Sequence, residues 1–168
     1  MPINTKIIAP TIDMVKYCLF KYAEAPSCIA EAISCILEFP ALELKIFFPV
    51  NRGNTHWTMA AIYIEKREII YYDSMGSAGR DITESLLRYL DDESKDKRGY
   101  PLEDKNSWSL KKGKSPIQTN GYDCGVFATM NIDFLSDDLP LQYNQGDIAF
   151  FRNKIAANIV RGTMDYDV

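Results

Sequence analysis

PIQTNGYDCGVF, residues 116–127, is a polar, turn-forming stretch that contains a cysteine and leads into an apolar segment, Val126 to Leu135. Asn120-Gly121 indicates a turn, since both residues tolerate positive φ. We therefore expect Cys124 where a loop enters a buried helix, and the positive end of a helix dipole favours a thiolate. Gln118 precedes it by six residues and carries an amide that can donate to an oxyanion. The stretch thus combines a candidate nucleophile with a candidate oxyanion donor.

The chain has a single histidine, His56, which closely precedes a run with the composition of a buried strand, TMAAIYI at residues 58–64. After a charged turn at 65–68, a second strand, IIYY at residues 69–72, is followed by Asp73. Two strands joined by a short turn form a hairpin, so the start of the first strand faces the end of the second. We therefore expect His56 and Asp73 to be neighbours at one edge of the sheet.

These side chains make a thiol-protease constellation. Asp73 would hold one imidazole nitrogen of His56 and leave the other free to take a proton from Cys124. Each residue also has a plain structural interpretation: a buried core cysteine, a hydrogen-bonded histidine, a turn-forming aspartate and, for Gln118, a solvated loop residue. The composition of the loop before Cys124 favours the catalytic interpretation.

Three motifs, HW at 56–57, YDSM at 72–75 and QTNGYDCG at 118–125, resemble the SUMO-specific (Ulp/sentrin) cysteine proteases. The resemblance runs from about residue 48 to residue 160, and the motifs stand in the family's order and spacing. It implies an α/β (α+β), papain-like cysteine protease fold with a central mixed sheet flanked by helices. In that fold the nucleophile lies at a helix N-terminus.

The resemblance also implies a role for each matching residue. Cys124 would be the nucleophile, His56 the base, and Asp73 the residue that orients His56. Gln118 would form the oxyanion hole with the backbone N–H of Cys124, and Trp57 would cover the diglycine tail of the substrate. The implied reaction cuts after the C-terminal Gly-Gly of a ubiquitin-like protein, SUMO first among them, in its precursor or its conjugates.

The chain departs from this family before residue 48. The proteases that it resembles carry a longer N-terminal part with a tryptophan-led acidic segment, whereas no tryptophan here precedes Trp57. We expect one cysteine protease domain over 1–168, in which 1–47 is an atypical or shortened helical part. Four further functions stay open: a deubiquitinase, a deNEDDylase, an acetyltransferase on the same triad, or an inactive module that binds ubiquitin-like proteins.

Bulk composition limits the classes of partner. With 46% hydrophobic and 25% charged residues, the chain has the composition of a soluble globular protein. A net charge of −4 does not favour binding to nucleic acid. No apolar run is long enough for a membrane span. The N-terminus lacks the pattern of a secretion signal. We expect a monomer in the nucleus and/or cytoplasm, with a secreted bacterial effector as the alternative.

The cysteines predict neither a metal site nor a cofactor. None of the four forms a C-x-x-C pair, and one histidine does not complete a zinc-finger spacing. We interpret Cys18, Cys28 and Cys35 as small buried hydrophobic residues.

Periodicity predicts the remaining elements. Helices are expected over 11–25, 28–39 and 124–135, from Asp81, and from Asp147 with Ile148, Phe151, Ile155 and Ile159 on one stripe; strands are expected over 43–50 and 108–110. Asp81, Asp123 and Asp147 are candidate helix caps. The mixed-charge stretch 91–98 reads as a solvated helix end or loop. Lys111, Lys112 and Lys114 form either an exposed loop or a contact for an acidic partner.

Overall fold

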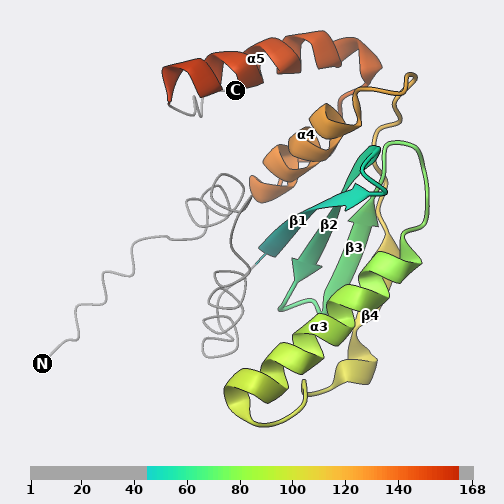
Figure 1. The fold of residues 1–168 in the computed structure, drawn as a ribbon, viewed down its shortest axis with the longest axis vertical. Helices are drawn as coiled ribbons and strands as arrows, with labels where there is room; N and C mark the ends of the chain where they lie inside the picture. The colour runs from blue at the N-terminus through green and yellow to red at the C-terminus, as the bar shows by residue number, and fades with distance from the viewer. Residues whose placement is uncertain (1–44, 163–168) are drawn as a thin grey trace, which may run out of the picture. The chain divides into compact units, whose positions relative to one another are not determined.

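The computed structural model describes residues 45–162. Its elements are β1 (Lys45–Arg52), β2 (His56–Tyr63), β3 (Glu68–Tyr72), α3 (Arg80–Arg98), η1 (Lys105–Ser107), β4 (Ser109–Lys112), α4 (Cys124–Ser136), η2 (Gln145–Asp147) and α5 (Ile148–Arg161) (Figure 1). The strands within this part of the chain form one sheet in the order β1-β2-β3-β4. The predicted helices 11–25 and 28–39, and with them Cys18, Cys28 and Cys35, lie outside the described residues.

The sheet is mixed, as the fold class predicts. The N–H of Ser109 donates to the carbonyl of Arg67 at 2.8 Å, and the N–H of Gly113 donates to that of Tyr71 at 2.7 Å. Both partners advance by four residues between the two bonds, so β4 runs parallel to β3. Parallel neighbours need a long crossover connection, and the segment that contains α3 supplies it here.

The described residues group into two compact units. The first comprises 45–48, 61–70 and 80–111, and its core contains Ile62, Ile69 and Leu90, against which Leu86, Leu87 and Leu110 pack. Leu86, Leu87 and Leu90 lie in α3 at helical spacing, so one stripe of the helix faces strand residues. The predicted cap at Asp81 is wrong by two residues, because α3 begins at Arg80 and the cap position falls on the positive-φ Gly79, whereas Asp81 lies in the first turn.

The charged stretch 91–98 is not simply solvated. Helix α3 continues to Arg98, and the Asp91 side chain is buried within this first unit. Its carboxylate accepts from Nζ of Lys105 and of Lys95, each at 2.8 Å, and from the N–H of Leu102 at 3.0 Å. The hydrogen bond from Lys105, followed by the one from Lys95, lowers the pKa of Asp91 well below its usual range. One buried carboxylate therefore fastens the chain after α3 back to the helix.

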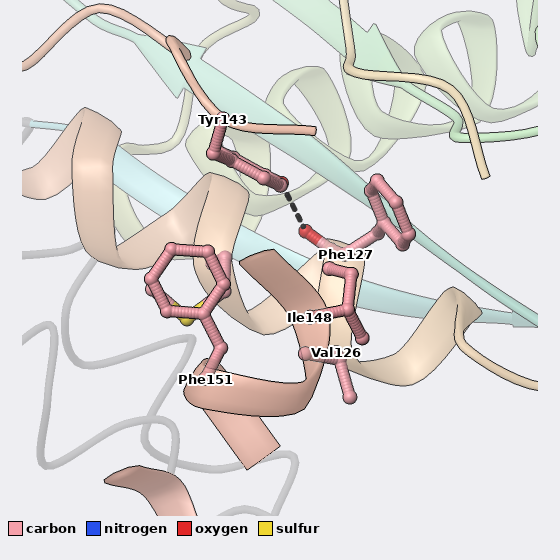
Figure 2. Packing of buried hydrophobic residues seen from close by; sticks show 6 residues of the cluster. Val126, Phe127, Tyr143, Ile148 and Phe151 are labelled. Atoms are coloured by element: carbon pink, nitrogen blue, oxygen red, sulfur yellow. Dashed lines mark hydrogen bonds between the residues drawn. The ribbon is translucent and has the colours of Figure 1, made fainter. Parts of the chain in front are cut away.

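The second unit comprises 49–60, 71–79 and 112–162, and α4 and α5 pack side by side in it (Figure 1). Figure 2 shows its core, which consists of Val126, Phe127, Met130, Tyr143, Ile148 and Phe151. Phe127 is completely buried, and the Tyr143 hydroxyl donates to the Phe127 carbonyl at 3.1 Å. Burial raises the pKa of Tyr143, so its hydroxyl stays protonated and remains a donor.

Two details of α5 differ from the sequence prediction. Ile159 is 61% exposed and does not continue the buried stripe of Ile148 and Phe151. Asp147 precedes α5 but makes no side-chain cap there, because its carboxylate accepts from the N–H of Asn144 at 2.9 Å in the capping box of η2. The helix ends at Arg161, with Gly162 at φ 65° as its C-cap.

Candidate active site

The β2–β3 hairpin brings His56 and Asp73 together, as the sequence predicts. His56 opens β2, and Asp73 directly follows β3. Nε2 of His56 lies 2.7 Å from Oδ1 of Asp73, and both side chains are largely buried. An acceptor at Nε2 fixes the neutral imidazole as the tautomer protonated on Nε2, so Nδ1 carries the lone pair.

Asp73 is held as an ionised acceptor by the turn that follows it. Its carboxylate accepts from the N–H of Met75 at 2.7 Å, from the N–H of Ser77 at 3.1 Å and from the Ser77 hydroxyl. Burial raises the pKa of Asp73, but the hydrogen bonds from Ser77, Met75 and His56 together outweigh burial and lower the pKa below its ordinary value. Sequence reasoning missed both Met75 and Ser77 as partners, although the bond to Met75 follows a known turn pattern in which an Asp side chain binds the backbone two residues on. Ser77 lies four residues on, outside that pattern.

Nδ1 of His56 is buried and has no hydrogen-bond partner among residues 45–162. Buried polar atoms without partners are uncommon in folded proteins, because leaving one unpaired costs free energy. The unpaired atom here, Nδ1 of His56, is the imidazole nitrogen that carries no proton in this tautomer. It is the atom that a proton-transfer role requires.

Cys124 is the first residue of α4, as predicted, and its side chain is buried. A Cβ placed on Gly125 would lie 3.8 Å from Cδ1 of Trp57. The start of β2, which carries His56, therefore lies near the first turn of α4, which carries Cys124. The Trp57 ring is 43% exposed, so it stands at the surface beside the cysteine.

Gln118 is buried beside the turn that carries Asp73. Its N–H donates to the carbonyl of Ser74 at 3.0 Å, and its Oε1 accepts from the Ser74 hydroxyl at 2.6 Å. Its Nε2 donates to the carbonyl of Asn120. The expected solvated alternative for Gln118 is therefore wrong, since its side chain is buried and both its amide oxygen and its amide nitrogen have partners within the fold.

The loop before Cys124 turns by a different means from the one predicted. Neither Asn120 nor Gly121 has a positive φ. Instead, Oδ1 of Asn120 accepts from the N–H groups of Tyr122 and Asp123, each at 3.1 Å. A side chain that mimics a backbone turn in this way needs no left-handed residue.

Asp123 makes no side-chain helix cap, contrary to the sequence prediction. Its buried carboxylate accepts from Nδ2 of Asn120 at 2.6 Å, from Nε2 of Gln145 at 2.7 Å and from Nε of Arg152 at 3.0 Å. Oε1 of Gln145 in turn accepts from the N–H of Thr119 at 2.8 Å. The hydrogen bond from Asn120 lowers the pKa of Asp123, and Arg152 and Gln145 lower it further against the opposing effect of burial. This carboxylate therefore fastens the loop before Cys124 to η2 and α5.

The depressed pKa of Asp123 predicts an acid-sensitive contribution to stability. A carboxyl whose pKa is lower in the folded state stabilises the fold above its unfolded pKa of about 3.9, and this contribution is lost as pH falls through the folded pKa. Asp123→Asn is expected to lower the free energy of unfolding at pH 7 by roughly 2 kcal/mol. The difference from wild type should shrink below about pH 4. Urea denaturation at several pH values measures it.

Asp92→Asn removes an exposed carboxylate of α3 and controls for the change in net charge. A wild-type minus Asp123→Asn difference that stays constant from neutral to acid pH would contradict the predicted linkage.

Lys111 and Lys112 lie in β4, not in a loop, and both have partners. Lys111 pairs with Glu68, and Nζ of Lys112 donates to the carbonyl of Gly76. These contacts favour the interpretation of Lys111, Lys112 and Lys114 as surface structure over a ready-made basic patch.

Within residues 45–162, no group of three or more His, Cys, Asp or Glu side chains is arranged to hold a metal ion. None of the helices in this part of the chain has both the length and the apolar character that a membrane crossing requires.

Comparison with solved structures identifies the fold. The chain superimposes on the C-terminal protease domain of yeast Ulp1, solved in complex with Smt3, the yeast ortholog of SUMO, with a TM-score of 0.60 and 28% identity over 79% of this chain and 61% of that one. The Ulp1-like SUMO protease catalytic domain of Chaetomium thermophilum matches with a TM-score of 0.61 and 28% identity over 72% of this chain and 47% of that one.

Sequence comparison gives the same family. The model of the Ulp1 protease family, C-terminal catalytic domain, matches residues 44–162, and the chain belongs to this family. It is 38% identical over 117 residues to the ubiquitin-like-specific protease ESD4 of Arabidopsis thaliana, covering 69% of this chain and 24% of the relative. It is also 38% identical over 117 residues to human sentrin-specific protease 2, covering 68% of this chain and 20% of the relative. The chain thus aligns with about a fifth to a quarter of the length of these relatives.

Proposed function

We propose that this chain is a thiol protease that hydrolyses the bond after the C-terminal glycine of a ubiquitin-like modifier, with SUMO as the first candidate. The observation that carries the proposal is the Asp73–His56 pair. The buried Nδ1 of His56 has no partner within residues 45–162, and the start of β2, where His56 lies, is near the first turn of α4. Membership in the Ulp1 protease family supports the same reaction.

Cys124 thiolate attacks the carbonyl carbon of the terminal glycine and forms a tetrahedral intermediate. The side-chain amide of Gln118 and the N–H of Cys124 donate to its oxyanion, and each such donor is worth roughly 3 kcal/mol in the transition state. His56, protonated by the thiol, gives its proton from Nδ1 to the leaving amine. Water then attacks the thioester while His56 takes its proton, and the thiol is regenerated.

Specificity for a glycine end has a steric basis in this proposal. Trp57 stands half-exposed beside Gly125, so a ring roofs the approach to Cys124. A channel under this ring admits residues without a Cβ and excludes larger ones. The sequence relatives named above are ubiquitin-like-specific and sentrin-specific proteases, and the yeast structure holds Smt3, which favours SUMO over ubiquitin or NEDD8.

The proposal extends to the whole chain. Residues 1–47 would belong to the same protease domain, and the protein would act as a monomer on SUMO conjugates or precursors in the nucleus and/or cytoplasm.

Covalent capture tests the proposal directly. The protein is mixed with SUMO, ubiquitin and NEDD8 probes that each carry a C-terminal electrophile, and the adducts are mapped by mass spectrometry. We expect a SUMO adduct on Cys124 and none with Cys124→Ala. An adduct with ubiquitin or NEDD8 alone would move the assignment to a deubiquitinase or deNEDDylase. Labelling of Cys124 by acyl-CoA donors instead would indicate an acyltransferase. SUMO binding without any adduct, in a folded sample, would indicate a binding module.

A further inference from the structure

Ser74 connects the two halves of the candidate site. It directly follows Asp73, and its hydroxyl donates to Oε1 of Gln118 at 2.6 Å, 44 residues further along the chain. The N–H of Gln118 also donates to the carbonyl of Ser74 at 3.0 Å. Both side chains are buried, with exposures of 3% and 7%. Two hydrogen bonds thus tie the acid-bearing turn to the proposed oxyanion donor.

These contacts determine which way the Gln118 amide points. The carbonyl of Asn120 only accepts, so the amide nitrogen must face it, and the amide oxygen must therefore face Ser74. The bond to Asn120 uses one of the two hydrogens on Nε2. The second hydrogen remains for a substrate oxyanion, and the oxygen is turned away.

We propose that Ser74 is a positioning residue that sets the orientation of the Gln118 amide for the oxyanion. The inference rests on the proposed function, in which Gln118 donates to the tetrahedral intermediate. Without the Ser74 hydroxyl, Oε1 loses its donor inside the protein, and the amide loses the contact that opposes its rotation. A rotated amide directs its oxygen at the developing negative charge. The free energy of the transition state rises, whereas that of the bound substrate does not change. We therefore expect kcat to fall and KM to be preserved.

Ser74→Ala tests this with SUMO carrying a C-terminal aminomethylcoumarin amide as substrate. We expect kcat to fall by about 10- to 100-fold, up to what loss of an oxyanion donor costs, with KM within about twofold of wild type. Alkylation of Cys124 by iodoacetamide forms no oxyanion, so its rate should stay within about twofold of wild type. Ser136→Ala, which removes a hydroxyl bonded at 2.8 Å to the carbonyl of Asp133 at the end of α4, is the matched control and should change neither rate.

A second measurement covers the case in which Ser74→Ala folds poorly. In the Gln118→Ala background the buried amide oxygen is absent, so removal of Ser74 leaves no unpaired acceptor. The double variant should have the same kcat as Gln118→Ala alone. An equal further loss in the double variant would show that Ser74 acts independently of Gln118 and would overturn the proposal.

The outcomes separate this inference from the proposed function. If wild type turns over substrate and folded Ser74→Ala has the same kcat, the role of Ser74 is overturned and the protease assignment stands. A parallel fall in turnover and alkylation would place the effect on the Asp73–His56 pair and also overturn the role. Absence of turnover in folded wild type would overturn the protease assignment, and the role of Ser74 with it.

Discussion

Cys124→Ala is expected to abolish hydrolysis of a SUMO substrate, with a rate at least about 10⁴-fold below wild type. The reason is chemical, because no other atom at the start of α4 can form the thioester. The substitution removes one buried sulfur from the first turn of the helix and leaves the Asp73–His56 pair and the Gln118 contacts in place. Binding of SUMO should therefore persist, and calorimetric titration measures it beside the turnover assay.

His56→Gln is the companion variant, because it removes the proposed base and keeps the thiol. It should also lose turnover, and the reaction of Cys124 with an electrophile should slow. Replacement of Cys18 by alanine provides the control for a cysteine outside the described residues. Turnover by Cys124→Ala within about tenfold of wild type would refute the assignment of the nucleophile.

Gly79→Ala is expected to destabilise the fold by roughly 3 kcal/mol or more. Gly79 has φ +57°, where a side chain is strained, and an added Cβ would lie 2.1 Å from the ring of Tyr71. Tyr71 is completely buried, and its hydroxyl lies 3.3 Å from that of Ser77, so the ring has no room to withdraw. Ser77 also holds Asp73, so loss of activity should accompany loss of stability. Urea denaturation gives the free energy of unfolding.

Two other glycines separate the causes. Gly76→Ala introduces strain alone, because Gly76 has φ +82° and no atom lies within 4 Å of an added Cβ. Gly121→Ala introduces neither strain nor contact, and its stability should match that of wild type. If Gly79→Ala were no less stable than Gly76→Ala, the clash with Tyr71 would not be what makes glycine necessary there.

The local chemistry of the chain predicts the core of the site. Two apolar strands joined by a short charged turn place His56 opposite Asp73, because hairpin geometry depends on neighbouring residues only. A polar loop followed by an apolar run places Cys124 at the start of a helix for the same reason. The mixed sheet is implied by the family resemblance of the motifs, and the structure and the comparisons confirm the sheet and the family.

Other parts of the site depend on residues far apart in sequence. The local sequence predicts that Asp123 caps the helix. In the structure its carboxylate instead accepts from Arg152, 29 residues later, and makes no cap. Gln118 reads as a solvated loop residue, yet Ser74 binds it across 44 residues. Such partners come together only when α5 packs on α4 and the loop closes on the hairpin. Sequence periodicity indicates which face of an element is apolar. The hydrogen-bond partner of a buried polar group is decided instead by the packed fold, because most such groups are paired with a donor or acceptor that tertiary packing brings near.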